Sequence, residues 1–102
     1  PQTMPDTDHS FMMYPIVVKT PIKRDELTLF LEEHNIETRP MVPLLNQPYY
    51  QQLFGADLED RYPVAKHINH HGFYIGCHPE LTLEELQYIV EKFAEFFKQK
   101  IL

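Results

Sequence analysis

Apolar positions along the chain follow two periods, which predicts strands mixed with helices. Phe11–Lys19 is rich in aromatic and β-branched residues, with apolar side chains at every second position, and predicts a strand. Because Pro15 lacks an N–H, we expect this strand at a sheet edge or a bulge. From Arg24 to His34 the apolar spacing is that of a helix buried on one face, and Asn35 is suited to end it.

The rest of the chain holds shorter elements and then one long helix. The predicted elements are a strand over Ile36–Arg39 closed by Pro40, helices over Pro48–Phe54 and Pro63–His71, a strand over Phe73–Gly76 and a helix from Thr82 to about Lys98. The last helix has the clearest start signal, a capping box of Thr82 and Glu85. The predicted fold class is α/β in the α+β two-layer sense: a small three-stranded, mainly antiparallel sheet with helices packed on one face.

Composition narrows the class of protein. The chain has 102 residues, enough for one domain, and its net charge of −6 argues against nucleic-acid binding driven by charge. Its apolar runs fall far short of the roughly 20 residues that span a bilayer. A single cysteine rules out an internal disulfide, and no secretory pattern is visible, so we expect a cytoplasmic protein without a membrane segment.

The first ten residues and the glycines suggest that the chain is part of a longer protein. Residues 1–10 are polar and interrupted by proline, which predicts a linker, and residues 11–102 form the domain. The three glycines, Gly55, Gly72 and Gly76, are too far apart to form a phosphate-binding loop. We therefore do not expect a self-sufficient nucleotide-binding fold.

The histidines offer two candidate sites, and the simpler interpretation is favoured for each. His67, His70 and His71 could bind a divalent metal from one helix, but histidines in a last helical turn also suit the helix dipole, and no third ligand stands at a typical spacing. His78 follows Cys77 directly, which suggests a Cys–His nucleophile pair. Neighbours on a strand point to opposite faces, so we expect these two side chains to diverge.

Neither the lysines nor the proline-rich segment settles the chemistry. The lysines fall at strand ends or on polar helix faces, so none is expected to form a Schiff base. The segment Ile36–Tyr50 places Arg39, Asn46 and Gln47 in a loop stiffened by prolines. It is either a binding loop, whose guanidinium suits phosphate or carboxylate, or a solvated connector.

Four stretches taken together resemble a known family. They are HSFMMYPIVV (His9–Val18), IETRPMVPLLNQPYY (Ile36–Tyr50), YPVAKHINHHGFYIGCHPELT (Tyr62–Thr82) and LEELQYIVEKF (Leu83–Phe93). In order and spacing they resemble the C-terminal domain of the DegT/DnrJ/StrS-type sugar aminotransferases, pyridoxal-phosphate enzymes of fold type I. The resemblance covers about residues 9–97, and it implies the small domain of such an enzyme.

The resemblance also implies a function and its partners. A larger N-terminal domain, absent from this sequence, would hold pyridoxal 5'-phosphate and the Schiff-base lysine of a homodimeric enzyme. That enzyme would transfer an amino group to a keto-deoxysugar nucleotide, and this chain would be inert alone, with no catalytic residue of its own. Carried over by motif, the candidate substrate-pocket residues are Arg39, Asn46, Gln47 and His78.

Departures from the family pattern keep alternatives open. The family loop commonly reads Pro-Leu-His before the Gln-Pro, whereas this chain has Pro43, Leu44, Leu45 and Asn46, which puts the sugar specificity in doubt. Gly76 and Cys77 stand where a proline is common. Some relatives use the same cofactor to dehydrate a deoxysugar. Outside the family, the alternatives are a free-standing α/β module for ligand binding or dimerisation, and a metal-binding protein that uses the three clustered histidines.

Overall fold

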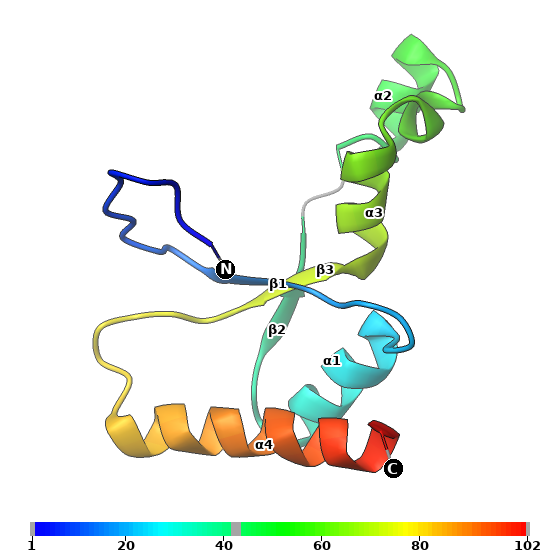
Figure 1. Cartoon of the computed structure of the whole chain (residues 1–102). Coiled ribbons are helices and arrows are strands. Elements are labelled where there is room, and N and C mark those ends of the chain that lie inside the picture. The colour runs from blue at the N-terminus through cyan, green and yellow to red at the C-terminus, as the bar shows by residue number, and fades with distance from the viewer. Residues whose placement is uncertain (1, 42–43, 102) are drawn as a thin grey trace.

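The computed structural model describes residues 2–41 and 44–101 (Figure 1). The elements in chain order are β1 (Tyr14–Val17), α1 (Arg24–Glu33), β2 (Thr38–Pro40), α2 (Pro48–Phe54), the 3₁₀ helix η1 (Leu58–Arg61), α3 (Pro63–His71), β3 (Gly72–Ile75) and α4 (Leu83–Ile101). Every predicted strand and helix is present, with ends shifted by a few residues. The sequence did not predict η1, and α4 continues beyond the expected end at Lys98.

The strands form an antiparallel sheet in the order β1-β3-β2. Tyr14 of β1 and Thr38 of β2 both pair with Ile75 of β3, so β3 is the central strand. Pro15 therefore lies on an edge strand, as predicted. Pro40 closes its strand as expected, although it is itself the last residue of β2 rather than the residue after it; an edge strand tolerates a proline there.

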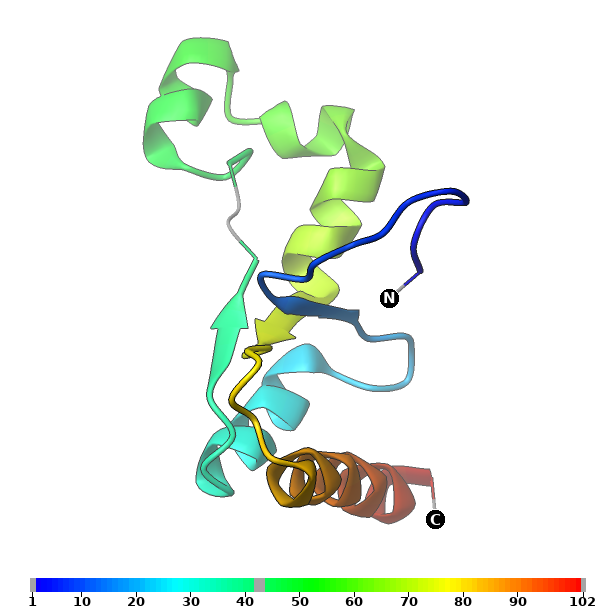
Figure 2. The same ribbon diagram turned by 90° about the vertical axis from the view of Figure 1, so that its left-hand side faces the viewer.

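The core lies between the sheet and two helices, α1 and α4, which cover one face (Figures 1 and 2). Its buried residues are Val18, Leu27, Leu31, Ile36, Phe73, Ile75 and Phe96. Leu27 and Leu31, one turn apart on α1, are fully buried, as the helical spacing predicts. The predicted α+β class is thus confirmed, and the other face of the sheet carries no helix (Figure 2).

Two of the predicted local signals fix the ends of the core helices. Asn35 has φ 61°, the left-handed conformation expected after α1, although the helix ends at Glu33 rather than His34. At the start of α4, the Thr82 N–H donates to Glu85 Oε2 at 2.7 Å and the Glu85 N–H donates to Thr82 Oγ1 at 3.2 Å. This is the predicted capping box, and it sets the direction in which α4 leaves the sheet.

The helices α2 and α3, with η1, do not cover the sheet but project from it; we call residues 48–71 the arm and the strands with α1 and α4 the body (Figures 1 and 2). Helix α3 runs directly into β3 at Gly72, where a Cβ would collide with the Ile68 carbonyl oxygen. A glycine is therefore required by this close approach. Arg24 Nη1 of α1 donates to the Asn69 carbonyl oxygen at 2.6 Å and links the body to the arm.

Candidate functional site

A cleft of about 1100 Å³ lies where the sheet meets the first half of α4. Residues from three parts of the chain line it, among them Arg39 of β2, Tyr74 of β3, His78 in the segment after β3, and Glu84, Glu85, Tyr88 and Glu91 of α4. It is open to solvent, and its size is at the upper end of small-molecule sites, which span about 300–1,000 Å³. We treat it as the candidate functional site.

The guanidinium in the cleft is already engaged. Arg39 donates from Nε and Nη2 to Oε1 of Glu37, at 2.9 and 2.6 Å. This hydrogen bond raises the pKa of Arg39, and both side chains are mostly exposed. An anion that binds Arg39 must therefore share it with Glu37 or displace that carboxylate.

One wall of the cleft is the polar face of α4. Glu84, Tyr88 and Glu91 stand three or four residues apart and thus share a side of the helix. The Tyr88 hydroxyl donates to the His34 carbonyl oxygen at 3.0 Å, which ties this wall to the end of α1. Glu85 belongs to the capping box, and its hydrogen bonds from Thr82, the backbone N–H first, lower the pKa of its carboxyl group.

The charge of the cleft limits its chemistry. Four of its lining residues are glutamates, Glu37, Glu84, Glu85 and Glu91, against one arginine. Among the residues that the structure describes, no polar or charged side chain is buried. The cleft can therefore hydrogen-bond hydroxyl and amino groups, but its own field repels a diphosphate, and it holds no desolvated acid or base.

The structure divides the predicted pocket residues between two places. Arg39 and His78 line the cleft, whereas Asn46 and Gln47 lie just before α2, which is at the end of the arm away from the sheet, and are not part of the lining (Figure 1). The role of these residues in a pocket stays a prediction. Tyr74 and the α4 wall were not predicted from the sequence, although polar residues at helical spacing around Tyr88 are a signal that the sequence contains.

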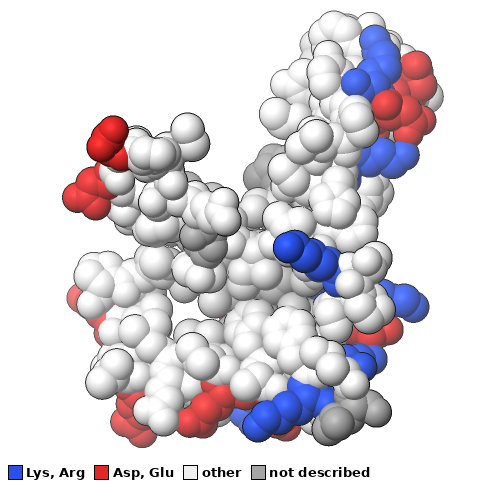
Figure 3. Space-filling model, viewed as in Figure 1, with Lys and Arg blue, Asp and Glu red and all other residues white. Residues whose placement is uncertain are grey.

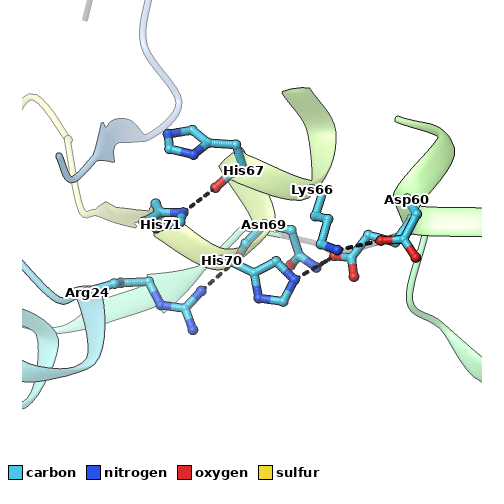
Figure 4. Close-up of polar contacts among 8 residues, drawn as sticks. Arg24, Asp60, Lys66, His67, Asn69, His70 and His71 are labelled. Atoms are coloured by element: carbon cyan, nitrogen blue, oxygen red, sulfur yellow. Dashed lines mark hydrogen bonds and ion pairs between the residues drawn. The ribbon is translucent and has the colours of Figure 1, made fainter. Parts of the chain in front are cut away.

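The clustered histidines do not converge on a metal (Figure 4). The rings of His67 and His71 stack with centroids 4.3 Å apart, and His71 Nδ1 lies 2.9 Å from the His67 carbonyl oxygen. His70 points to the other side of α3, where Nε2 lies 2.8 Å from Oε1 of Glu59. Within residues 2–41 and 44–101, no three His, Cys, Asp or Glu side chains are grouped to hold a metal ion, so the metal-binding alternative has no ligand set there.

Cys77 and His78 do not lie on a strand, although the expectation that their side chains diverge assumed that they do. Both residues lie after β3, which ends at Ile75, so the alternation of a strand does not apply to them. Cys77 is half-buried and His78 is exposed at the rim of the cleft. Their directions follow from the irregular segment that connects β3 to α4.

The lysines of the chain do not suit a Schiff base with pyridoxal phosphate. Such a lysine must lose its proton near neutral pH, which requires a lowered pKa. Hydrogen bonds to Asp60 and to Glu95 instead raise the pKa values of Lys66 and Lys92. Lys19, Lys23, Lys98 and Lys100 are exposed, so the residues present do not fit covalent attachment of this cofactor.

None of the helices in the described part of the chain has both the length and the apolar composition needed to cross a membrane. This includes α4, the longest at 19 residues, whose outer face carries several charges.

Comparisons with known proteins identify the family. A profile of the DegT/DnrJ/EryC1/StrS aminotransferase family matches residues 1–94. The chain is 35% identical over 101 residues to the lipopolysaccharide biosynthesis protein RfbH of Salmonella typhimurium, covering 95% of this chain and 23% of that protein. It is 30% identical over 96 residues to GDP-perosamine synthase of Escherichia coli O157:H7, covering 93% and 25%. It is 38% identical over 93 residues to a pleiotropic regulatory protein of Geobacillus stearothermophilus, covering 88% and 23%.

The chain thus spans about a quarter of the length of the curated relatives it matches. The family match, in contrast, covers nearly all of the chain. The resemblance carried by the four stretches is confirmed, and the chain belongs to the DegT/DnrJ/EryC1/StrS aminotransferase family.

Proposed function

We propose that this chain is the C-terminal small domain of a pyridoxal-phosphate-dependent nucleotide-sugar aminotransferase, a cytoplasmic homodimer that transfers an amino group to a keto-deoxysugar nucleotide. The observation that carries the proposal is the family match over residues 1–94. The names of two relatives, a GDP-perosamine synthase and a lipopolysaccharide biosynthesis protein, support the sugar substrate class. In this proposal residues 1–10 link the domain to the preceding part of the polypeptide.

The cofactor belongs to the missing N-terminal large domain in this proposal, because the lysines of this chain are exposed or have a raised pKa. Pyridoxal phosphate would supply the electron sink for amino transfer. The residues of this chain bind and orient the substrate in this proposal: Arg39 and His78 from the cleft, and Asn46 and Gln47 from the segment just before α2. Since glutamates dominate the cleft, the diphosphate of the substrate is assigned to cations outside this chain, and the cleft to uncharged hydroxyl groups.

The test compares the isolated chain with the longer product of the gene that encodes it. The longer product, incubated with glutamate and a 4-keto-deoxysugar nucleotide, should yield the amino sugar by mass spectrometry. A dehydrated sugar instead would select the dehydratase alternative. The 102-residue chain with pyridoxal phosphate should show no absorbance of an internal Schiff base. A stoichiometric lysine adduct trapped by borohydride on this chain would overturn its inertness.

A further inference from the structure

The arm carries exposed apolar side chains along its α-helices. Neither α2 nor α3 contains a buried residue. Its exposed apolar side chains are Tyr49, Tyr50, Leu53 and Phe54 of α2, Tyr62 before α3, and Val64 and Ile68 of α3, each 38–73% exposed. Clusters of this kind, rich in aromatic residues, are typical of protein interfaces.

The charged groups of the arm lie on one side and are paired there. Lys66 pairs with Asp60, His70 lies 2.8 Å from Glu59, and Arg61 lies 3.9 Å from Asp57. Figure 3 shows these charges along the outer edge of the arm, while the side that faces the N-terminal segment is uncharged.

Helix α3 shows how this division arises. His67 and His71 point to the side opposite Lys66 and His70 (Figure 4). Val64 and Ile68 share the side of His67 and His71 by helical spacing.

The uncharged side of the arm is one wall of a hollow. Its floor is the sheet face that carries no helix, and residues 2–13 form the other wall (Figures 1 and 3). We call this surface the saddle. Val17, on the edge strand β1, is 41% exposed at the sheet. The saddle is therefore concave and bordered by apolar side chains.

The amount of exposed surface indicates how large the interface over the saddle is. The chain exposes 8123 Å², whereas a compact monomer of 12.2 kDa exposes about 6,100 Å². Its radius of gyration is 16.0 Å, against about 13 Å for a compact domain of this length. An excess of about 2,000 Å² on one partner corresponds to the large, obligate class of interfaces.

We propose that the saddle is the docking surface for the remaining part of a family-length polypeptide, with the arm as its principal contact. This inference rests on the proposed function, and it adds which face of the domain is covered. The relatives are about four times as long as the matched region, so the remaining part is large enough to fill the hollow. A second copy of this chain fits less well, because a two-fold contact would place one concave surface against another.

The test measures amide hydrogen exchange of residues 48–71 in the isolated chain and in the longer product of the gene. Docking should slow exchange in α2 and α3 at least tenfold in the longer product, and the isolated chain should sediment as a monomer. Val64→Glu should reduce this protection at least fivefold. Val90→Glu on α4 is the matched control, because the two valines are 73% and 67% exposed, and it should leave the protection unchanged. Leu53→Glu, 55% exposed on α2, serves as a second arm variant.

The possible results test the docking surface and the proposed function separately. Equal exchange of the arm in the two proteins, or equal effects of Val64→Glu and Val90→Glu, would overturn the docking surface even if the longer product is an active aminotransferase. Protection of the arm in a longer product without aminotransferase activity would support the docking surface and overturn the proposed function. A dimer of the isolated chain that Val64→Glu dissociates would assign the saddle to a second copy. A gene that encodes only these residues would overturn both proposals.

Discussion

The body and the arm both contain helices, but the two regions are stabilised differently. Seven buried apolar residues hold the body together, whereas the one buried apolar residue in the described part of the arm is Leu58. Helices α2 and α3 have seven and nine residues, shorter than the about 12–15 that an isolated helix needs. The arm therefore depends on contacts outside itself, and the body does not. Substitutions in the two regions should differ in size and in kind.

The largest loss of stability is expected from a substitution at the centre of the body. Phe73 on β3 is fully buried against α1 and α4. Phe73→Ala should cost about 3–5 kcal/mol of unfolding free energy, because it removes a large apolar side chain and leaves a cavity. Urea denaturation followed by circular dichroism measures this loss. A cost below about 1 kcal/mol would mean that the core lies elsewhere.

The matching substitution in the arm should act locally. Leu58 is 6% exposed in η1 and lies outside the cluster that forms the main core. Leu58→Ala should cost about 2 kcal/mol, at the low end for such substitutions, since the site is small and open enough to relax. The loss should appear as faster amide exchange across residues 48–71, with little change in the urea midpoint of the body. A global loss as large as that of Phe73→Ala would show that arm and body unfold as one unit.

The same contrast separates what the sequence could predict from what it could not. The buried positions Leu27 and Leu31 and the capping box follow from spacing, because helix period and capping are local properties. The apolar pair Val64 and Ile68 also resembles a core-facing edge, yet in this chain both are exposed. The local pattern does not indicate which other part of a protein covers such an apolar edge.

The cleft could not be predicted from the sequence for a related reason. Its walls come from β2, β3 and α4, segments that only the tertiary fold brings together. The sequence therefore indicated Arg39 and His78 through a family resemblance but gave no reason to join them with Tyr88. Asn46 and Gln47 have the same motif support, yet the fold places them at the arm.

A smaller effect is expected at the start of α4. Thr82→Ala removes the hydroxyl that accepts the Glu85 N–H, and it should cost the body about 1 kcal/mol. Thr28→Ala is the control, because Thr28 lies inside α1, where alanine is the better helix former. Thermal unfolding should show a lower midpoint for Thr82→Ala alone. Equal midpoints for the two variants would mean that the box does not stabilise the helix.

The smallest effect is a difference between body and arm in their response to pH and salt. In the body, hydrogen bonds from Thr38 and Thr82, the backbone N–H first in each case, lower the pKa values of Glu32 and Glu85. In the arm, the side-chain hydrogen bond from Lys66 lowers the pKa of Asp60.

The sign is the same for all three groups. Because folding lowers each carboxyl pKa, the ionised group stabilises the folded state at pH values above its ordinary pKa, about 4.3 for glutamate and about 3.9 for aspartate. This contribution is lost as the pH falls from that value through the lowered pKa.

Salt should separate the contributions of Asp60 in the arm and Glu85 in the body, because it screens the ion pair of Asp60 more than the dipolar hydrogen bonds of Glu85. Thermal unfolding of the body between pH 6 and 3 should show a loss of stability that persists in 1 M salt and is reduced by Glu85→Gln. The protection of arm amides by Asp60 should decrease with salt already at pH 6, and Asp60→Asn should abolish that salt dependence. Identical salt responses of the Glu85 and Asp60 contributions would contradict the view that hydrogen bonds from Thr82 hold Glu85 and an ion pair with Lys66 holds Asp60.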